Sequence, residues 1–419
     1  MEARLAALLV LGAFLGSAAN LAIYRLAWHP RAISPWSWPE PSAPPRRAWD
    51  RLPIFGWLGL RREASLYGAG FWVRPMLLEL LAGIGLAWLY WWEVAQGGLL
   101  PPGVPRPLPA DWLPTVHLEF VAHAMLGFLM LVASLIDADE KIIPDEITIP
   151  GTLVGLLLAA AWPRMLLPDA VPIIGGGWHL DFLHLASPDD WPASLDGAPQ
   201  QGPLVLALFC WWLWCAALLP RSWYGRHGWR RAAVLCWARI VRDPSTPRLL
   251  RMALMGALAI AVVWFHGGPG WQGLLTALVG MAASGGFVWL VRVLCTAALH
   301  REAMGFGDVT LMAMIGAYLG WQSCLVVFFL APLAGLMVGV LRLILFRDRE
   351  IPYGPFLCLA AIFLVVRWQA IWEYTQGVFL LGWLVPLVML ACPVLMAVML
   401  ITWRLMLFLL AHLWERGRG

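Results

Sequence analysis

Long apolar runs separated by short polar connections fill most of the chain. We mark eleven such runs, at about 5–27, 76–95, 117–136, 147–162, 204–219, 251–266, 272–295, 309–321, 323–346, 355–372 and 378–403. A bilayer core about 30 Å thick is crossed by roughly 20 apolar helical residues. Backbone polar groups in lipid must be hydrogen-bonded within the segment, which favours helices. The pattern therefore predicts an all-α, polytopic membrane bundle of about 11 transmembrane helices.

The composition excludes an ordinary soluble protein. Hydrophobic residues make up 61% of the 419 residues and charged residues only 13%, about half of the roughly 25% charge share of soluble domains. The 28 Trp residues suit the two interfaces of a bilayer, where indoles gather. The seven Cys lie mostly in apolar runs, so we expect neither a disulfide framework nor a zinc cluster. Membrane lipid is the first partner that the sequence predicts.

The basic residues predict the orientation, because loops rich in Arg and Lys stay in the cytoplasm. The connections 29–74 and 220–251 carry most of the loop Arg residues, whereas 163–203 carries five Asp against one Arg. Eleven crossings place the N-terminus outside and the basic C-terminal tail inside. On this map Arg367 falls late in an outward-running span, where it must snorkel or find a partner.

Two acids interrupt the apolar pattern. Asp137 ends the third run in ASLIDADEKIIPDEITIP, and Asp308 opens the eighth in AMGFGDVTLMAMIGAYLG. A carboxylate at membrane depth costs roughly 2.5 to 3.5 kcal/mol on insertion scales, so such acids are candidates for function. Both fall at the predicted cytoplasmic edge although the chain separates them by 171 residues. We expect them to meet there.

Two neighbouring carboxyls form the acid and base of a water-activating site. They cannot both ionise cheaply, so the pair shares one proton. The ionised member takes a proton from water while the protonated member donates to the scissile carbonyl oxygen. This chemistry needs no metal, no other cofactor and no covalent intermediate.

Several residues near the two acids are possible supporting groups. Gly305 and Gly307 flank Phe306 just before Asp308, and glycine permits the close approach of an extended peptide; a plain interhelical turn is the alternative. Asp145 follows Pro144 and is either an N-cap of the next helix or a third functional acid. We expect Asp139 and Glu140 to be solvated charges.

Other signals carry no function. The segment Gly268–Gly273 matches GxGxxG but follows no strand, so a dinucleotide site is not predicted. His117, Glu119 and His123 do not share one helix face as a set, and we interpret the two histidines as interfacial rather than metal-binding. No nucleic-acid module is present.

The separated motifs, taken in order, resemble the type IV leader peptidase family, the bacterial prepilin peptidases among the GxGD aspartyl membrane proteases. Besides the two acidic motifs, the similarity rests on Gly16-Ser17-x-x-Asn20 with Tyr24-Arg25-Leu26, on RLPIFGWLGLR from Arg51 to Arg61, on Glu79, and on IPYGPFL from Ile351 to Leu357. It covers about 15–82, 117–162 and 276–366.

The resemblance implies that Asp137 and Asp308 are a catalytic pair in the bacterial inner membrane. It implies cleavage, at the cytoplasmic face, of the basic leader of prepilin or pseudopilin precursors, ahead of an apolar helix that stays in the bilayer. A proton-coupled or ion transporter with paired aspartates and a catalytically dead pilus-assembly scaffold are the alternatives. The particular precursor and the oligomeric state are left open.

Three departures from the family pattern matter. Family members commonly carry two CxxC pairs, a zinc site, in the first cytoplasmic loop, where this chain reads SPWSWPEP and RREASLYG. We therefore expect no zinc there and consider N-methyltransferase activity doubtful. Either that activity is lost, or the loop folds by Pro and Trp packing instead. Two additional spans lie within 163–271, and Thr310 stands where the family often has Lys.

The resulting organisation has three parts. Residues 1–95 form N-terminal helices with a Cys-less loop, a degenerate version of the family's N-terminal region. Residues 117–372 form a peptidase membrane domain with an inserted two-helix segment at about 163–271. Residues 373–419 form a C-terminal helix and a basic tail. An even number of inserted spans preserves the sidedness of Asp137 and Asp308.

Overall fold

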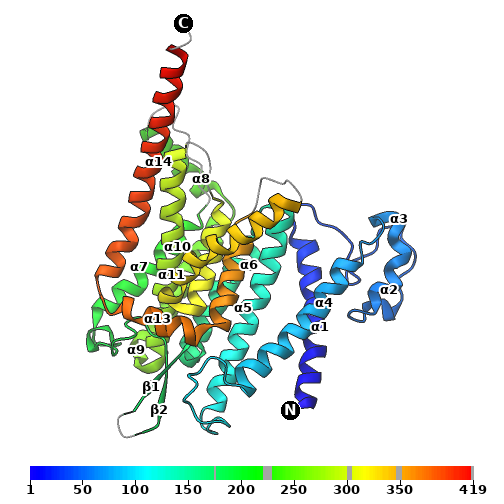
Figure 1. Cartoon of the computed structure of the whole chain (residues 1–419), viewed down its shortest axis with the longest axis horizontal. Coiled ribbons are helices and arrows are strands. Elements are labelled where there is room, and N and C mark those ends of the chain that lie inside the picture. The colour runs from blue at the N-terminus through cyan, green and yellow to red at the C-terminus, as the bar shows by residue number, and fades with distance from the viewer. Residues whose placement is uncertain (174–175, 220–228, 300–303, 346–351, 417–419) are drawn as a thin grey trace.

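The structure, a computed structural model, is a bundle of helices with one small hairpin (Figure 1). It describes the whole chain except residues 174–175, 220–228, 300–303, 346–351 and 417–419. Parts of the predicted basic loop 220–251, of the basic tail and of the IPYGPFL motif, with Ile351, therefore lie outside the described residues. The longer elements are α1 (Glu2–Leu26), α2 (Gly56–Leu60), α3 (Ala64–Tyr67), α4 (Val73–Tyr90), α5 (Leu113–Glu140), α6 (Asp145–Ala161), β1 (Pro168–Pro172), β2 (Trp178–Phe182), α7 (Gln201–Ala217), α8 (Trp229–Arg242), α9 (Thr246–His266), α10 (Gly268–Leu299), α11 (Phe306–Leu345), α12 (Gly354–Val366), α13 (Trp368–Phe379) and α14 (Leu384–Arg416).

The prediction of an all-α polytopic membrane protein is confirmed. Among the described residues, seven helices are long and apolar enough to cross a membrane, and α12 with α13 forms a further apolar pair bent by 96°. Each of the eleven predicted runs is helical over most of its length, α6 and α7 being shorter at 17 residues each. The N-terminus and the C-terminus lie at opposite ends of the bundle (Figure 1). Their placement outside and inside the cell stays a prediction.

The first half of α11 is the centre of the bundle. Every residue from Asp308 to Gly320 is buried, as expected for a helix that is apolar on all sides. Small residues bring its neighbours close: a Cβ added to Gly280 of α10 would lie 2.2 Å from the Gly316 carbonyl oxygen, and one added to Gly155 of α6 would lie 2.7 Å from the Tyr318 ring. Helices in lipid pack through such contacts because they gain no hydrophobic energy from association.

A break at Gly320 divides α11 into two halves. Gly320 has φ 78° and ψ 170° inside the helix, a conformation that favours glycine. Along α11, Gly307 lies against Ile143, Gly320 lies near Leu183, and Gly335 lies near Phe356. Phe356 comes two residues after Gly354, whose backbone N–H donates to Asp137. The chain therefore returns toward the Asp137 end after Gly320. This agrees with the prediction of two separate runs, 309–321 and 323–346.

The predicted span 355–372 is too long. Helix α12 ends at Val366, and α13 leaves it at 96°. Arg367 lies at this junction and is exposed, so its charge sits at the bend between two helices rather than within one straight helix. The bend is fixed by indoles that the apolar pattern did not distinguish: Trp368 Nε1 donates to the Pro168 carbonyl (2.8 Å) and Trp372 Nε1 to Asp169 Oδ1 (3.3 Å).

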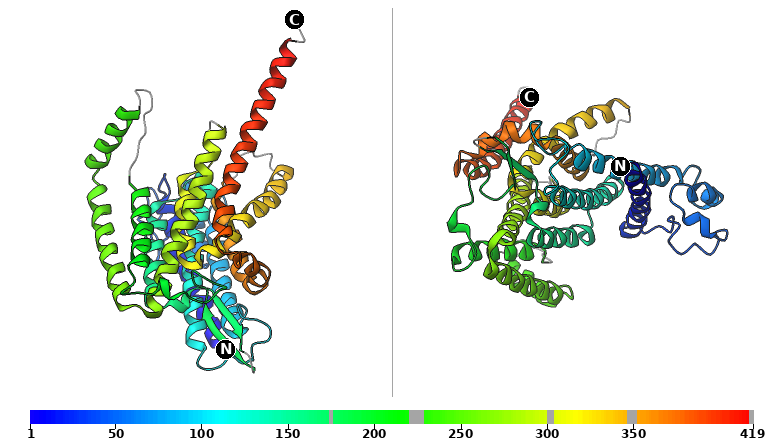
Figure 2. Two further views of the ribbon diagram at one scale, coloured as in Figure 1. Left: turned by 90° about the vertical axis from the view of Figure 1, so that its left-hand side faces the viewer. Right: turned by 90° about the horizontal axis from the view of Figure 1, so that it is seen from below.

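The segment 163–271, which the sequence predicts to be an insertion, contains more than the two predicted helices. Besides α7 and α9 it includes the helix α8 and the antiparallel hairpin β1–β2, in which Ala170 pairs with Leu180. The hairpin lies at the end of the molecule opposite the C-terminus, and α8 and α9 form an outer edge of the bundle (Figure 2). Trp321 Nε1 and Gln322 Nε2, which follow Gly320, donate to the carbonyls of Leu185 and His184 at 3.0 and 2.8 Å. These bonds fasten the segment to α11.

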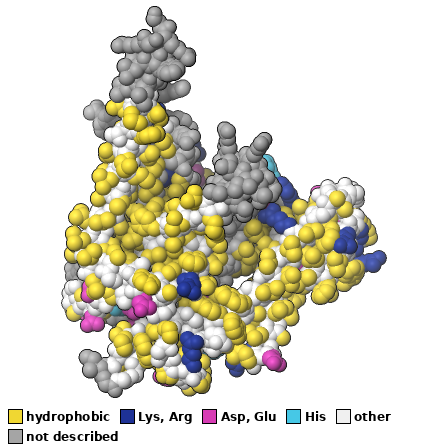
Figure 3. All heavy atoms as spheres, in the orientation of Figure 1, with side chains coloured by type: hydrophobic (Ala, Val, Ile, Leu, Met, Phe, Trp, Pro, Cys, Tyr) yellow, Lys and Arg dark blue, Asp and Glu magenta, His cyan; other side chains and the backbone are white. Residues whose placement is uncertain are grey.

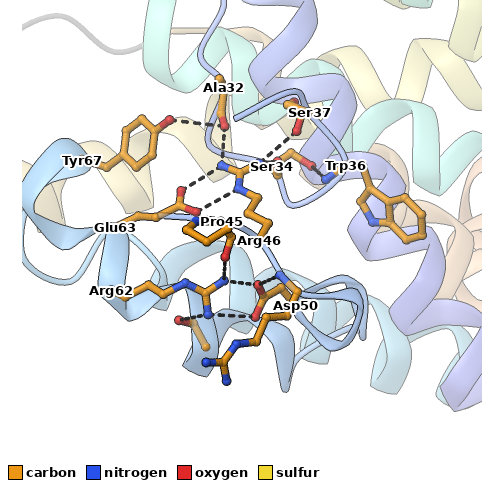
Figure 4. A network of polar contacts seen from close by, with 12 residues as sticks. Ala32, Ser34, Trp36, Ser37, Pro45, Arg46, Asp50, Arg62, Glu63 and Tyr67 are labelled. Atoms are coloured by element: carbon orange, nitrogen blue, oxygen red, sulfur yellow. Dashed lines mark hydrogen bonds and ion pairs between the residues drawn. The ribbon is translucent and has the colours of Figure 1, made fainter. Parts of the chain in front are cut away.

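In the N-terminal region, the loop between α1 and α4 folds around the guanidinium of Arg46 (Figure 4). Arg46 Nη1 donates to the carbonyls of Ser34 and Ser37 at 2.7 and 3.0 Å, Nη2 to that of Ala32 at 2.9 Å, and the fork binds both Glu63 oxygens at 2.8 and 2.9 Å. Ser34 and Ser37 lie in SPWSWPEP and Glu63 in RREASLYG. Arg46 thus joins the two stretches where the family carries its Cys pairs.

The residues of this loop do not fit a zinc ion, because carbonyls, one carboxylate and a cation replace the thiolates that zinc prefers. The expectation of Pro and Trp packing is incomplete, and the loss of the methyltransferase activity stays a prediction. A small core of Ile33, Trp57 and Leu60 is present, and Arg62 forms a second ion pair with Asp50.

Replacing Arg46 with Met should open the loop. The substitution leaves the Glu63 carboxylate, whose side chain is 0% exposed, buried without its partner, which costs about 3 to 5 kcal/mol. Hydrogen exchange of the backbone in 29–72 should accelerate, while Arg31→Met, at an exposed position, should leave it unchanged. Equal exchange in both variants would show that Arg46 does not hold the loop.

Candidate active site

Asp137 lies in the last turn of α5, as the sequence predicts. Its carboxylate is buried, and its Oδ2 accepts a hydrogen bond from the backbone N–H of Gly354 at 3.1 Å. The helix ends because Lys141 adopts a left-handed conformation and donates its N–H to the Asp137 carbonyl at 2.9 Å, a common C-terminal cap. Asp137 is therefore held between the end of α5 and the start of α12.

Asp308 lies in the first turn of α11 and is also buried. Its carboxylate has a hydrogen bond with the backbone of Gly305, the residue before the helix. This is half of a capping box, in which an acid in the first turn reaches back to a free N–H. Thr310, at the position of the family's Lys, donates its hydroxyl to the Gly307 carbonyl at 3.1 Å. The first turn of α11 is thus fixed by its own side chains.

The two carboxyls come together at one end of the bundle. Ile143 lies between their supports: a Cβ added to Gly307 would be 2.8 Å from Ile143 Cβ, and one added to Gly354 would be 2.9 Å from Ile143 Cδ1 and 2.6 Å from Asp137 Oδ2. Asp137 and Asp308 are close enough to interact electrostatically. The thiol of Cys358, in the first turns of α12, also lies within electrostatic range of both carboxyls.

Sequence reasoning missed a cation beside this pair. Arg292 of α10 lies within electrostatic range of Asp308, and its Nε donates to the Met304 carbonyl at 2.8 Å in the connection before α11. It supplies a positive charge to a site that has Thr310 in place of the family's Lys. The signal was available, because an Arg inside an apolar run is a functional candidate by default.

The predicted supporting residues differ in whether they lie beside the two carboxyls. Gly305 and Gly307 lie beside the pair, Gly305 by its backbone bond to Asp308 and Gly307 by its approach to Ile143. Asp145 does not cap α6: the N-cap is Pro144, no side chain caps the helix, and Asp145 is the first helical residue. An exposed acid in that turn still suits the positive end of the helix.

Asp139 and Glu140 are not simply solvated. Asp139 forms an ion pair with Arg74 at the start of α4, with nitrogen to oxygen distances of 2.8 and 2.9 Å. Glu140 accepts the backbone N–H groups of Trp28 and His29. The two acids therefore hold the N-terminal region against the end of α5 that carries Asp137.

Three of the separated motifs converge in the N-terminal region. Asn20 Nδ2 donates to Glu79 Oε1 at 3.3 Å, and the backbone N–H of Ile54 donates to Glu79 Oε2 at 2.5 Å. Glu79 is completely buried. Ile54 has φ 66°, which is unusual for a β-branched residue. The polar residues of α1, of RLPIFGWLGLR and of α4 thus form one buried cluster.

Within the described residues, no three His, Cys, Asp or Glu side chains are arranged to hold a metal ion. The two histidines of α5 have different surroundings, and their interpretation as interfacial stays a prediction. His123 is buried and binds Glu93 through Nδ1 at 2.8 Å, whereas His117 is half-buried and contacts the Tyr90 hydroxyl at 3.2 Å.

Comparison with known proteins identifies two matching family models. The type IV leader peptidase family matches residues 232–340, and the bacterial peptidase A24 N-terminal domain matches residues 10–93. Asp308 lies within the first of these regions, and Asp137 lies between the two. No solved structure matches the chain significantly.

Curated relatives carry the name prepilin leader peptidase/N-methyltransferase. One from Aeromonas hydrophila is 31% identical over 141 residues, 32% of this chain and 48% of that protein. One from Pseudomonas putida is 22% identical over 328 residues, 77% of this chain and 68% of that protein. One from Escherichia coli K12 is 30% identical over 111 residues, 25% of this chain and 49% of that protein.

The chain spans about half the length of curated relatives such as the Aeromonas protein. The two matched regions contain the motifs that the fold brings together at Asp308 and at Glu79. Residues 10–93 and 232–340 are therefore similar to the type IV leader peptidase family and its bacterial N-terminal domain.

Proposed function

We propose that this protein is an intramembrane aspartyl endopeptidase of the bacterial inner membrane. It removes the basic leader from prepilin-like or pseudopilin precursors at the cytoplasmic face. The observation that carries the proposal is the meeting of Asp137 and Asp308, two buried carboxyls from the terminal turns of α5 and α11, beside the Gly354 N–H. The names of the relatives support the substrate class.

The pair acts on water. One carboxyl is ionised and takes a proton from a water molecule, whose oxygen attacks the scissile carbonyl carbon. The other is protonated and donates to the carbonyl oxygen as the tetrahedral intermediate forms. The carbon–nitrogen bond then breaks, and the leaving amine takes up a proton from the pair. The Gly354 N–H holds Asp137 Oδ2 in one orientation, which leaves the second oxygen of that carboxyl for the water.

The surroundings of the pair suit a basic leader. Asp145 and Glu146 are exposed in the first turn of α6, which begins a few residues after α5 ends. Opposite charges attract more strongly at a membrane edge than in bulk water, because the local dielectric is lower. A basic leader therefore lies beside these acids while its cleavage site reaches Asp137 and Asp308.

The position of the acids disfavours the alternatives. A transporter binds its ion near the bilayer midplane, at broken helices, whereas both carboxyls lie in the terminal turns of their helices. A dead scaffold has no use for two buried carboxyls whose desolvation is unfavourable. The peptidase is the function that accounts for both observations.

Replacing either aspartate with Asn should abolish cleavage. Purified Asp137→Asn and Asp308→Asn should each cut a prepilin-type precursor at least roughly 100-fold more slowly than wild type, because one proton-transfer group is lost. Asp111→Asn, at an exposed position, is the control and should cut normally. Normal cleavage by both active-site variants would refute the proposal.

Adding one methyl group at Gly354 should slow the reaction. The Cβ of Gly354→Ala would lie 2.6 Å from Asp137 Oδ2, so the carboxyl must move, and small displacements in a site cost about 10- to 100-fold in rate. Gly377→Ala has open space around its Cβ and should match wild type. A Gly354→Ala rate equal to that of Gly377→Ala would contradict the proposed role of this hydrogen bond.

The cleaved product should carry no added methyl group. The loop that holds the family's Cys pairs is rebuilt around Arg46, and the doubt about N-methyltransferase activity rests on that difference. Mass spectrometry of the mature substrate N-terminus, after incubation with S-adenosylmethionine, measures this directly. A gain of one methyl mass would show that methylation is independent of the Cys cluster.

A further inference from the structure

An apolar groove begins beside the candidate active site. It is a cavity of about 650 Å³ between α4, α5 and α12, and Gly12 and Leu15 of α1 also line it. At one end it is lined by Pro355 and Phe356, which directly follow Gly354, the donor to Asp137. The groove is therefore continuous with the site at which the scissile bond is held.

The groove is open to the lipid along its side. Leu81 of α4 and Leu359 of α12 line it and are 65% and 45% exposed. Among the residues that the structure describes, no acidic or basic side chain other than His123 lines it. An occupant can therefore enter sideways from the bilayer, and it must be apolar along its length.

A polar cluster closes the far end of the groove. His123 Nδ1 binds Glu93 Oε1 at 2.8 Å, and Glu119 lies one helical turn before His123. All three are at least 95% buried, and Glu93 sits in the π-helical turn Trp91–Ala95 that ends α4. This contact joins the end of α4 to α5 at that end of the groove.

The walls have the character of a helix-packing surface. Gly85 of α4 and Gly127 of α5 both line the groove, and a Cβ added to either meets nothing within 4 Å. Ala82 and Ala124 lie one turn away on the same walls. Small residues let the backbone of another helix approach closely in lipid. An acyl chain gains nothing from that arrangement.

We infer that this groove binds the apolar helix of the precursor that follows the scissile bond. The inference rests on the proposed function and names how the same site holds its substrate. The lining of α5 runs from His123 to Leu135, which is about 20 Å at 1.5 Å per residue. A helix that starts at Asp137 and follows α5 therefore packs against the enzyme for three to four turns. The leader itself stays outside the groove.

Figure 3 shows the broad apolar surface onto which such a helix would move before it enters the groove. The remainder of this surface carries large exposed side chains, such as Leu387 and Met399 of α14. The groove differs from it by its hollow shape, its glycines and its continuity with Gly354.

Filling the groove tests the inference with two substrates. One is the full precursor, and the other is a leader peptide that ends a few residues after the cleavage site and lacks the apolar helix. In Gly127→Leu the preference for the full precursor, as the ratio of the two kcat/KM values, should fall about tenfold or more. Gly286→Leu, which also has open space around its Cβ but lies on α10 outside the groove, should keep the wild-type ratio.

The outcomes separate this inference from the proposed function. If wild type cuts neither substrate, the proposed function fails. If wild type cuts both and Gly127→Leu keeps the wild-type ratio, the groove does not hold the helix. An equal loss on both substrates would also overturn the inference, and it is the result expected if a lipid acyl chain fills the groove.

Photo-cross-linking provides a test that does not require turnover. Asp308→Asn is mixed with a precursor that carries a photoreactive residue about ten positions after the scissile bond. Gly127 lies ten residues before Asp137 along α5. Because two α-helices rise by the same distance per residue, that photoreactive residue should lie at the depth of Gly127. Cross-links should map to α4, α5 or α12. Cross-links confined to lipid, or to α9 and α14, would overturn the inference.

Discussion

A single hydrogen bond connects the two halves of the candidate site. The backbone N–H of Gly354 donates to Asp137, and the two residues are 217 positions apart in the chain. Carboxyls near lipid need polar partners, and the only abundant ones in an apolar bundle are the free N–H groups at helix ends. The start of α12 provides one for Asp137, and Gly305, before α11, provides another for Asp308. The positions of the helix termini therefore determine where a pair of buried acids can lie in this bundle.

The rest of the bundle serves to keep those termini in place. The buried half of α11 is packed between α10 and α6 at glycines, which fixes the depth of Asp308. The break at Gly320 returns the chain to the same end, where α12 then begins. Helices α7 and α9 of the segment 163–271 lie outside this arrangement, and Trp211 Nε1 of α7 donates to the Ala253 carbonyl of α9 at 2.8 Å. This segment thus lengthens the chain between the acids without separating them.

Apolar length and acid placement were predictable from sequence, whereas polar contacts between distant segments were not. The eleven runs are helical, and Asp137 and Asp308 lie in the terminal turns of their helices, because both follow from local patterns. The bend after Val366 was missed because it depends on Trp368 bonding to Pro168, 200 residues away. The Arg46 network was missed because an Arg in a basic loop gives no local sign that its partners are carbonyls of Ser34 and Ser37. Arg292 could have been recognised from its place inside an apolar run, but it was overlooked.

The central claim is that two acids far apart in sequence are neighbours in the folded protein. Cross-linking measures this most directly, in a variant in which the seven native Cys are replaced and both Asp137 and Asp308 are changed to Cys. A short cross-linker with two thiol-reactive alkylating groups should join the two positions within one chain and so keep the two fragments together after cleavage of the intervening loop. The same reagent should fail with the pair Asp111→Cys and Asp308→Cys. Failure with the first pair under conditions that label both thiols would contradict the account.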